Sequence, residues 1–384
     1  MPWTETVIMQ RLEFIRAIQN SGESFSAVCR QFKISRKTGY KWLNRFQLDD
    51  PLSLQDRSRA RLTHASCIPD EIIQLLIDMR RKHPDWGPVK IRDWLLNKNV
   101  PFNVPASSSI GDILKKENLV TPIKRRQRAP DNLQPLTEIC QVNQVWSADF
   151  KGKFKLRNQS YCCPFTLTDN HSRYLLACEA NDNENGSFVK LCFEKAFREY
   201  GLPDVIRTDN GRPFAGNGVA GLSYLSVWWI KLGILPERIQ KGYPGQNGRH
   251  ERMHRSLKAG MKHGHIYRTL EEQQVWFNHY RHEFNFERPH NVHHGKTPSS
   301  QWIPSIKQWD GVVREVEYPK DAHLYRVHAK GNISAGSRLL FLSESLRGEY
   351  VMMKEVDDGL HVILFDRLIL AYYDSIEGQI LRID

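Results

Sequence analysis

The sequence lacks the features that mark membrane and secreted proteins. No apolar run approaches the roughly 20 residues needed to cross a bilayer. Residues 1–10 show no basic start followed by a long apolar stretch. The seven cysteines include no Cys-x-x-Cys pair, and their odd number disfavours a disulfide framework or a zinc cluster. We therefore expect a cytoplasmic protein with reduced cysteines and no membrane contact.

Acidic residues are too few to balance the basic ones. The chain has 55 Lys and Arg against 43 Asp and Glu, which leaves a net charge of +12. Such an excess favours polyanionic partners, because each cation placed on a phosphate releases condensed counterions. An ordinary basic protein can have the same balance, so the charge indicates nucleic acid without establishing it.

The first 50 residues have the pattern of a helix-turn-helix domain. We expect helices at 4–20, 25–32 and 36–46, with Ser35 capping the last. Four basic residues lie on that third helix: Arg36, Lys37, Lys41 and Arg45. A basic helix after a short turn is typical of a reader that enters the DNA major groove. A plain helical bundle is the alternative.

A second helical unit follows after a polar, basic linker at 51–68. Helices at about 71–82, 89–97 and 108–117 make residues 69–120 a second predicted helix-turn-helix domain. Residues 121–139 form another linker, in which Arg125, Arg126 and Arg128 are suited to tracking along phosphates. A solvated charged linker is the alternative here, and both can hold.

The pattern changes at residue 140 and again at about 305. Residues 140–304 have short β-rich runs followed by alternating strands and helices, which predicts an α/β layer architecture. Residues 305–384 have short apolar runs separated by turn signals such as Asp357-Asp358-Gly359, which predict a small antiparallel β-barrel. The predicted fold is therefore multidomain, all-α at first, α/β in the centre and β at the end.

Three acidic residues of the α/β segment stand out by position. Asp149 lies inside an apolar strand, where a carboxylate is costly unless it is paired or bound to metal. Asp209 ends another strand, and Glu251 lies in the first turn of a helix that Asn247 is placed to cap. Carboxylates from these three elements can converge, and oxygen ligands favour Mg²⁺ or Mn²⁺. Two such ions about 4 Å apart can promote phosphoryl transfer.

The order of motifs around these acids resembles the integrase catalytic core. The blocks are residues 146–152, 168–174, 207–211 and 246–258, followed by Asn285, Arg288-Pro289-His290 and Thr297-Pro298. Across residues 140–304 the chain is similar to bacterial insertion-sequence transposases of the DDE superfamily that includes retroviral integrases. The resemblance implies a ribonuclease H-like core that cuts DNA at element ends and joins the strands to target DNA.

The resemblance also implies which residues act and with what partners. Asp149, Asp209 and Glu251 would be the catalytic triad holding two Mg²⁺ or Mn²⁺ ions. The partners would be double-stranded DNA, namely terminal inverted repeats and target DNA, and further copies of the chain as a homodimer or larger oligomer on the nucleoid. One departure is the 41 residues between Asp209 and Glu251, which exceed the family's usual spacing. We attribute the excess to a surface loop at 216–221.

The helix of Glu251 carries two further patterns. Arg255, Lys258 and Lys262 share its face at helical spacing and can bind a phosphate backbone, although a solvated face is the alternative. The run from His250 to His254 also matches the zinc metalloprotease pattern, in which Glu251 would be a general base. That interpretation leaves Asp149, Asp209 and the basic charge unexplained. A catalytically silent DNA-binding regulator of the same fold is the other alternative.

Overall fold

The computed structural model describes residues 7–48, 50–56, 68–120, 136–240, 242–336 and 338–382. The chain divides into two compact units, Met1–Cys67 and Ile68–Asp384. No helix in the described ranges is long and apolar enough to span a membrane. The six cysteines that fall in these ranges are all unbonded thiols, as the sequence predicts.

The first unit is a three-helix domain. Its elements are α1 (Val7–Asn20), α2 (Phe25–Gln31), α3 (Arg36–Leu43) and the 3-10 turn η1 (Pro51–Leu54). They close over a small core that includes Phe14, Val28 and Trp42. The Oγ of Ser35 accepts the backbone N–H of Thr38 at 3.2 Å, so the predicted cap is present. Helix α3 ends earlier than predicted, and Arg45 lies beyond its C-terminal end.

The second unit begins with three more helices. They are α4 (Asp70–Lys82), α5 (Pro88–Asn97) and α6 (Ser107–Lys116), packed around the fully buried Trp86. An ion pair of 2.6 Å between Asp85 and Arg288 joins this segment to the following α/β core. The predicted phosphate-tracking residues Arg125, Arg126 and Arg128 lie outside the described residues.

A five-stranded mixed sheet forms the centre of the second unit, in the order β5-β4-β1-β6-β7. Strand β1 pairs antiparallel with β4 and parallel with β6. The strands are β1 (Val145–Phe150), β4 (Phe165–Asp169), β5 (Leu175–Glu179), β6 (Val205–Thr208) and β7 (Leu235–Arg238), with a small hairpin of β2 (Phe154–Lys155) and β3 (Tyr161–Cys162) beside them. This arrangement confirms the predicted α/β layers.

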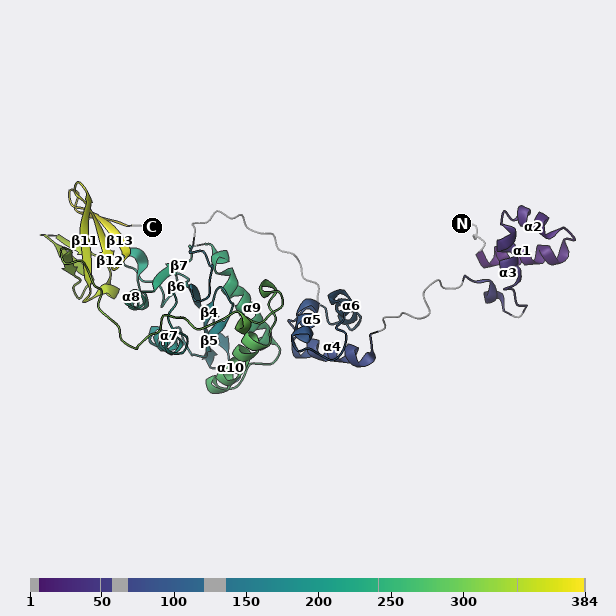
Figure 1. Ribbon diagram of the computed structural model, residues 1–384, viewed down its shortest axis with the longest axis horizontal. Coiled ribbons are helices and arrows are strands. Elements are labelled where there is room, and N and C mark those ends of the chain that lie inside the picture. The colour runs from purple at the N-terminus through teal and green to yellow at the C-terminus, as the bar shows by residue number, and fades with distance from the viewer. Residues whose placement is uncertain are drawn as a thin grey trace. The chain divides into compact units, whose positions relative to one another are not determined.

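Side-chain alternation gives the central sheet two different faces. Trp146, Ala148, Phe165 and Leu167 pack under α7 (Gly186–Tyr200) and α8 (Tyr224–Lys231). The intervening residues of β1 and β4 therefore point to the other face, which is covered by α9 (Gly248–Lys262) and α10 (Leu270–Phe286). Figure 1 shows the two helix pairs on opposite sides of the sheet. Asp149 and Thr166 belong to the α9 face.

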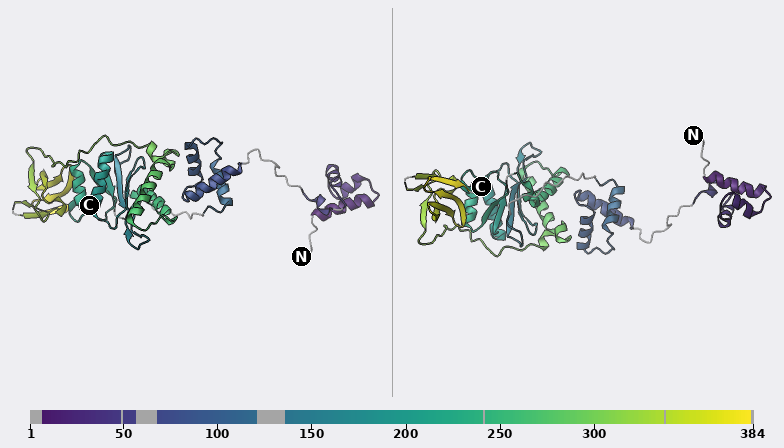
Figure 2. Two further views of the ribbon diagram at one scale, coloured as in Figure 1. Left: turned by 90° about the horizontal axis from the view of Figure 1, so that it is seen from below. Right: turned by 90° about the horizontal axis from the view of Figure 1, so that it is seen from above.

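The C-terminal segment consists of antiparallel strands, as predicted. One sheet has the order β14-β13-β12-β11-β8 and the other pairs β10 with β9. Their bounds are β8 (His323–Arg326), β9 (Asn332–Ala335), β10 (Arg338–Phe341), β11 (Tyr350–Asp357), β12 (Leu360–Phe365), β13 (Leu368–Asp374) and β14 (Gln379–Arg382). In the ranges 305–336 and 338–382 these pairings form two separate sheets. Closure of the strands into a barrel therefore stays a prediction. Figure 2 shows the strands in yellow beside the teal core helices.

Short 3-10 turns complete the second unit, and one of them corrects a prediction. The turns are η2 (Val219–Gly221), η3 (Pro244–Asn247), η4 (Asn291–His293), η5 (Pro298–Ser300) and η6 (Glu344–Leu346). The glycine-rich segment of η2 is not a free surface loop. Val219 is 1% exposed, and its backbone N–H donates to Leu342 O at 2.7 Å. The segment attaches the core to the C-terminal sheets, because their shared apolar core includes Val219.

Candidate metal and DNA-processing site

The three predicted acids lie on the elements that the sequence indicates. Asp149 is the fifth residue of β1, Asp209 follows the last residue of β6, and Glu251 is in the first turn of α9. Because β1 and β6 are parallel neighbours, Asp149 and Asp209 lie towards the same end of the sheet. Helix α9 packs against β1 and brings Glu251 to that region. Asp149 is largely buried, whereas Glu251 is exposed.

The electrostatics show that these carboxylates act on one another. The pKa of Asp149 is raised to about 7, first by burial and then by the negative charge of Asp209, with a further contribution from Glu251. The positive charge of Lys151 opposes this shift but does not cancel it. The site therefore has an excess of negative charge that a divalent cation would neutralise.

Asn247 has a different role from the one predicted. Its side chain makes no capping hydrogen bond to α9, which corrects the sequence interpretation. Instead, Nδ2 of Asn247 donates to Oδ2 of Asp149 at 3.3 Å. The residue before α9 thus holds the carboxylate on β1, and it links the helix of Glu251 to the strand of Asp149.

A buried hydrogen-bond cluster on the same face joins α9 to β4. The Oγ1 of Thr166 lies 2.8 Å from Nε2 of His250 and 2.7 Å from Nε2 of His254. The same hydroxyl donates to the backbone oxygen of Asp149 at 3.0 Å. On the other side of the ring, Nδ1 of His250 lies 2.8 Å from Oγ1 of Thr168. Sequence analysis missed this cluster, because it depends on the pairing of β1 with β4.

The geometry of the cluster determines its tautomers. A hydroxyl has one proton, and that of Thr166 is donated to the carbonyl of Asp149, so both imidazoles must donate to it through Nε2–H. The Nδ1 of His250 then accepts from Thr168. Burial lowers the pKa of His250 to about 3 and that of His254 to about 2, so both rings are neutral near pH 7. The Nδ1 of His254 is left as an unprotonated acceptor.

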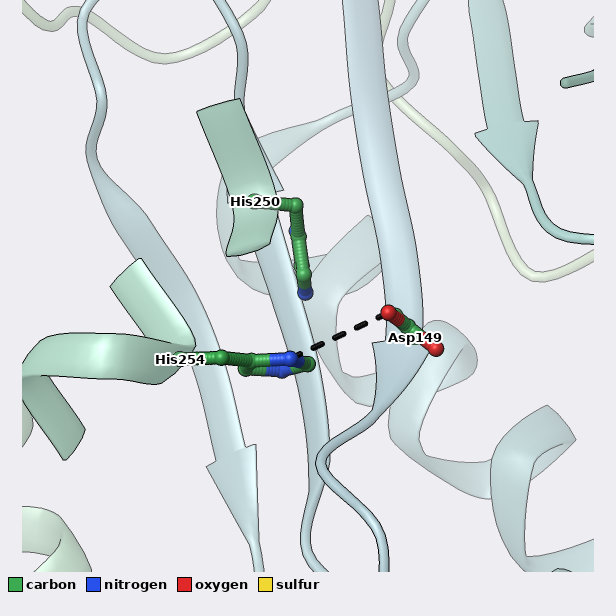
Figure 3. A group of neighbouring side chains, drawn as sticks. All are labelled: Asp149, His250 and His254. Carbon is green, nitrogen blue, oxygen red and sulfur yellow. Dashed lines mark ion pairs between the residues drawn. The ribbon is translucent and has the colours of Figure 1, made fainter. Parts of the chain in front are cut away.

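This unprotonated nitrogen faces the carboxylate. The Nδ1 of His254 lies 3.8 Å from Oδ2 of Asp149 (Figure 3), which is longer than a hydrogen bond. In the part of the chain that the structure describes, Asp149, His250 and His254 form a group whose candidate ligand atoms all lie within 4.8 Å of one another. Asp209 and Glu251 do not belong to this tight group. They contribute charge to it from further away.

The zinc protease pattern does not fit this arrangement. In such a site the Nε2 atoms of both histidines bind the metal and the glutamate is the general base. Here both Nε2 atoms converge on the hydroxyl of Thr166, which takes the place that zinc would need. Both nitrogens of His250 are already hydrogen-bonded. The carboxylate oxygens that remain are the ligands that Mg²⁺ and Mn²⁺ prefer.

The basic residues predicted to contact DNA are mostly accessible. Arg36, Lys37 and Lys41 of α3 are exposed, whereas Arg45 is half-buried with its guanidinium 5.4 Å from the ring centroid of Trp42. Arg255, Lys258 and Lys262 are all exposed on α9, on the same face as Glu251. Both sets are free to reach a polyanion.

A cavity in another part of the second unit is not lined by the three predicted carboxylates. Its volume is about 1220 Å³, and it lies between α7, α8, the glycine-rich segment and the turn η6. None of the three predicted carboxylates lines it. The three predicted carboxylates lie instead at the end of the sheet near Asp149.

Comparison with known families agrees with this architecture. The integrase core domain matches residues 140–244, and a second integrase core domain family matches residues 232–298. A helix-turn-helix domain matches residues 10–61, and a homeodomain-like domain matches residues 38–114. These matches fall on the two helical segments and the α/β core.

Two curated relatives come from bacterial insertion elements. The uncharacterized 31.7 kDa protein of insertion element IS407 from Burkholderia multivorans is 26% identical over 41% of this chain and 54% of its own length. The uncharacterized 39.2 kDa protein of IS476 from Xanthomonas euvesicatoria is 22% identical over 60% of this chain and 64% of its own. The chain thus spans between about half and two thirds of each relative.

Solved structures with similarity to the chain include retroviral integrases. The HTLV-2 integrase catalytic core domain in complex with magnesium has a TM-score of 0.34 and 18% identity, covering 42% of this chain and 97% of that one. A simian T-cell lymphotropic virus intasome in complex with PP2A regulatory subunit B56 gamma has a TM-score of 0.37 and 15% identity, covering 80% and 95%.

The family matches and the architecture together confirm the predicted fold class. Helix-turn-helix segments precede a ribonuclease H-like α/β core, and antiparallel sheets follow it. The order of domains, the two integrase matches and the insertion-element relatives agree with one another. Over residues 140–298 the chain therefore has the integrase core domain, and part of its length is similar to proteins of bacterial insertion elements.

Proposed function

We propose that this chain cuts DNA at the ends of a mobile element and transfers the freed strands into target DNA. The observation that carries the proposal is the position of Asp149 beside Asp209 and Glu251: burial first, and then the negative charges of these two acids, raise the pKa of Asp149 to about 7. Carboxylates concentrated in this way beside exposed cations are suited to divalent ions and to a phosphodiester.

In this proposal Asp149, Asp209 and Glu251 hold two Mg²⁺ or Mn²⁺ ions. When bound, such ions activate an attacking oxygen and stabilise the leaving oxygen of an in-line displacement. The residues around them position the ligands. Asn247 orients Asp149, and the Thr166 hydroxyl fixes both histidines of α9, so that helix and strand keep one register.

The DNA-binding surfaces are assigned in the same proposal. Arg36, Lys37 and Lys41 on α3 would contact the terminal inverted repeat, with Arg45 as a secondary contact. Arg255, Lys258 and Lys262 would follow the backbone away from the ions, and Arg125, Arg126 and Arg128 would contact phosphates between the domains. Because two DNA ends are joined, we propose at least a homodimer on nucleoid DNA.

The test combines metal dependence with a matched substitution. Purified full-length chain is incubated with duplex DNA carrying the element terminus, with Mg²⁺ or with EDTA. We expect nicking only with Mg²⁺, and we expect Asp149→Asn to abolish it while DNA affinity stays within about twofold. Glu317→Gln, at an exposed acid of the C-terminal segment, is the control and should cut normally. Binding without nicking in either condition would favour the silent regulator instead.

A further inference from the structure

A cavity on the opposite side of α9 from Glu251 gathers positive charge. Its volume is about 380 Å³. One carboxylate lines it, that of Asp169. Five cationic side chains also line it, namely Lys90, Arg173, Arg249, Arg252 and Arg288. Such an excess in a partly enclosed space is unfavourable unless an anion joins it.

The cations of the cavity have few partners in the described ranges. Arg288 is paired with Asp85 at 2.6 Å, whereas Arg173, Arg249 and Arg252 form no ion pair there. The guanidinium groups of Arg173 and Arg249 instead donate to the same backbone oxygen, that of Asn170. The carboxylate of Asp169 is occupied by Ser172 and by the backbone N–H of Asn143. It therefore does not pair with the arginines.

The cations also lie close enough to repel one another. Burial first, and then the charges of Arg249 and Arg252, lower the pKa of Arg173 to about 10. Burial and the charge of Arg288 lower the pKa of Lys90 to about 8. Nearby, Nε2 of His290 is buried without a hydrogen-bond partner in the described structure.

Two local features of the backbone are unfavourable in the absence of a ligand. Arg249 lies in the first turn of α9, where the helix dipole disfavours cations, and Arg252 follows one turn later. Arg173 has φ 66°, a left-handed conformation that is uncommon for residues other than glycine. Departures of this kind from local preference concentrate at functional sites.

The cavity is connected to the carboxylate site through one strand. Thr168 lines the cavity and bonds Nδ1 of His250, while Thr166 bonds Nε2 of the same ring and lies opposite Asp149 in the sheet. Two residues along a strand span about 7 Å. A ligand in the cavity is therefore near the proposed metal site, yet separated from it by His250.

We propose that this cavity binds a backbone phosphate of the DNA strand that enters the carboxylate site. The guanidinium fork of arginine matches phosphate oxygens, and three arginines without acidic partners are available for it. The inference rests on the proposed function, because it supplies that site with a second point of attachment for the same strand. One phosphate held in the cavity fixes which neighbouring phosphodiester lies at Asp149.

The first test measures binding without cleavage. Affinity of the full-length chain for a fluorescein-labelled duplex carrying the element terminus is measured in EDTA from 50 to 200 mM salt. We expect the double variant Arg249→Gln, Arg252→Gln to bind about tenfold more weakly and to lower the slope of log K against log[salt] by up to about 2. The control is Arg198→Gln on α7, which is on the other side of the sheet. If the double variant and the control both have the wild-type slope of log K against log[salt], the proposal is overturned.

The second test locates the phosphate. Neutral methylphosphonates replace single backbone phosphates near the terminus. The wild-type chain should lose affinity at one or two positions, and the double variant should lose nothing further there. Equal sensitivity of both proteins at every position would overturn the proposal even if affinity had fallen. Thermal unfolding midpoints that agree within about 2 °C show that the variant is folded, and Lys90→Gln provides an independent variant on α5.

The outcomes separate this inference from the proposed function. Absence of nicking in Mg²⁺, with the predicted methylphosphonate pattern in EDTA, removes the catalytic activity and leaves the phosphate site in place. Normal nicking with no change in salt slope removes the phosphate site alone. Stabilisation of the wild type by inorganic phosphate, without any sensitive DNA position, would show that the cavity takes a free anion and would contradict the proposal.

Discussion

The Nδ1 of His254 faces Oδ2 of Asp149 at 3.8 Å, a separation longer than a hydrogen bond. The tautomer is imposed from the other side of the ring, where Nε2–H donates to Thr166 at 2.7 Å. Two electron-rich atoms at this separation attract a cation or a water molecule. The relationship ties the folding of α9 onto β4 to the chemistry at β1, because a shift of the helix would move this nitrogen.

Divalent metal should therefore stabilise the folded chain. At a Mg²⁺ concentration 100 times its Kd, the free energy of unfolding should rise by about 2.7 kcal/mol. Asp209→Asn and Glu251→Gln should each reduce the gain, because each removes a negative charge that acts on the site. Urea unfolding in Mg²⁺ and in EDTA measures the difference, with Glu317→Gln as the control. A gain that is the same in all four proteins would place the ions elsewhere.

The stability of the metal-free chain should depend on pH through Asp149. Its folded pKa of about 7 lies above the value near 4 of an unfolded aspartate, so the folded state holds the proton more tightly. This contribution is present below pH 4 and is lost as pH rises towards 7 and beyond. In EDTA, the free energy of unfolding of the wild type should fall over that window by a few kcal/mol more than that of Asp149→Asn. Parallel pH profiles would show that the carboxylate is not perturbed.

The hydroxyl of Thr166 should matter more than that of Thr168. Thr166→Val leaves two buried N–H groups without their partner and removes one hydrogen bond to the carbonyl of Asp149, whereas Thr168→Val removes a single bond to His250. We expect losses of about 2–4 and about 1 kcal/mol respectively, since each unsatisfied buried group costs about 1–3 kcal/mol. Urea unfolding at pH 7 in EDTA compares them. Equal losses would contradict the shared-hydroxyl arrangement.

The sequence alone predicts the positions of the acids well, because strand ends and helix starts are local features. Asp149, Asp209 and Glu251 lie on the strand, at the strand end and in the first helical turn that the sequence predicts. Helix α10 was missed although its signals are present. Thr269 and Glu272 form a capping box, and Phe277 and Phe284 are buried one helical repeat apart.

The features that the sequence did not predict all depend on contacts between distant segments. Thr166 meets His250 and His254 only after β4 pairs with β1 and α9 covers them. Asn247 is a residue type that often caps helices, but its side-chain amide donates to Asp149 and makes no capping bond to α9. The cavity near Lys90 forms where α5 meets α9 and the segment after α10. Contacts of this kind cannot be predicted from a local sequence pattern.

The last prediction concerns the glycine-rich insertion between Asp209 and Glu251. A Cβ on Gly218 would lie 2.3 Å from Cβ of Ser343 and 2.5 Å from the backbone oxygen of Leu342, so the core and the C-terminal sheets must separate to admit it. Gly218→Ala should lower the free energy of unfolding by about 1–3 kcal/mol, as overpacking does. Gly245→Ala is the matched control, since a Cβ there meets nothing within 4 Å. Urea unfolding measures both variants. If Gly218→Ala proves as stable as Gly245→Ala, the insertion does not fix the C-terminal sheets, and its close packing against Ser343 has no energetic consequence.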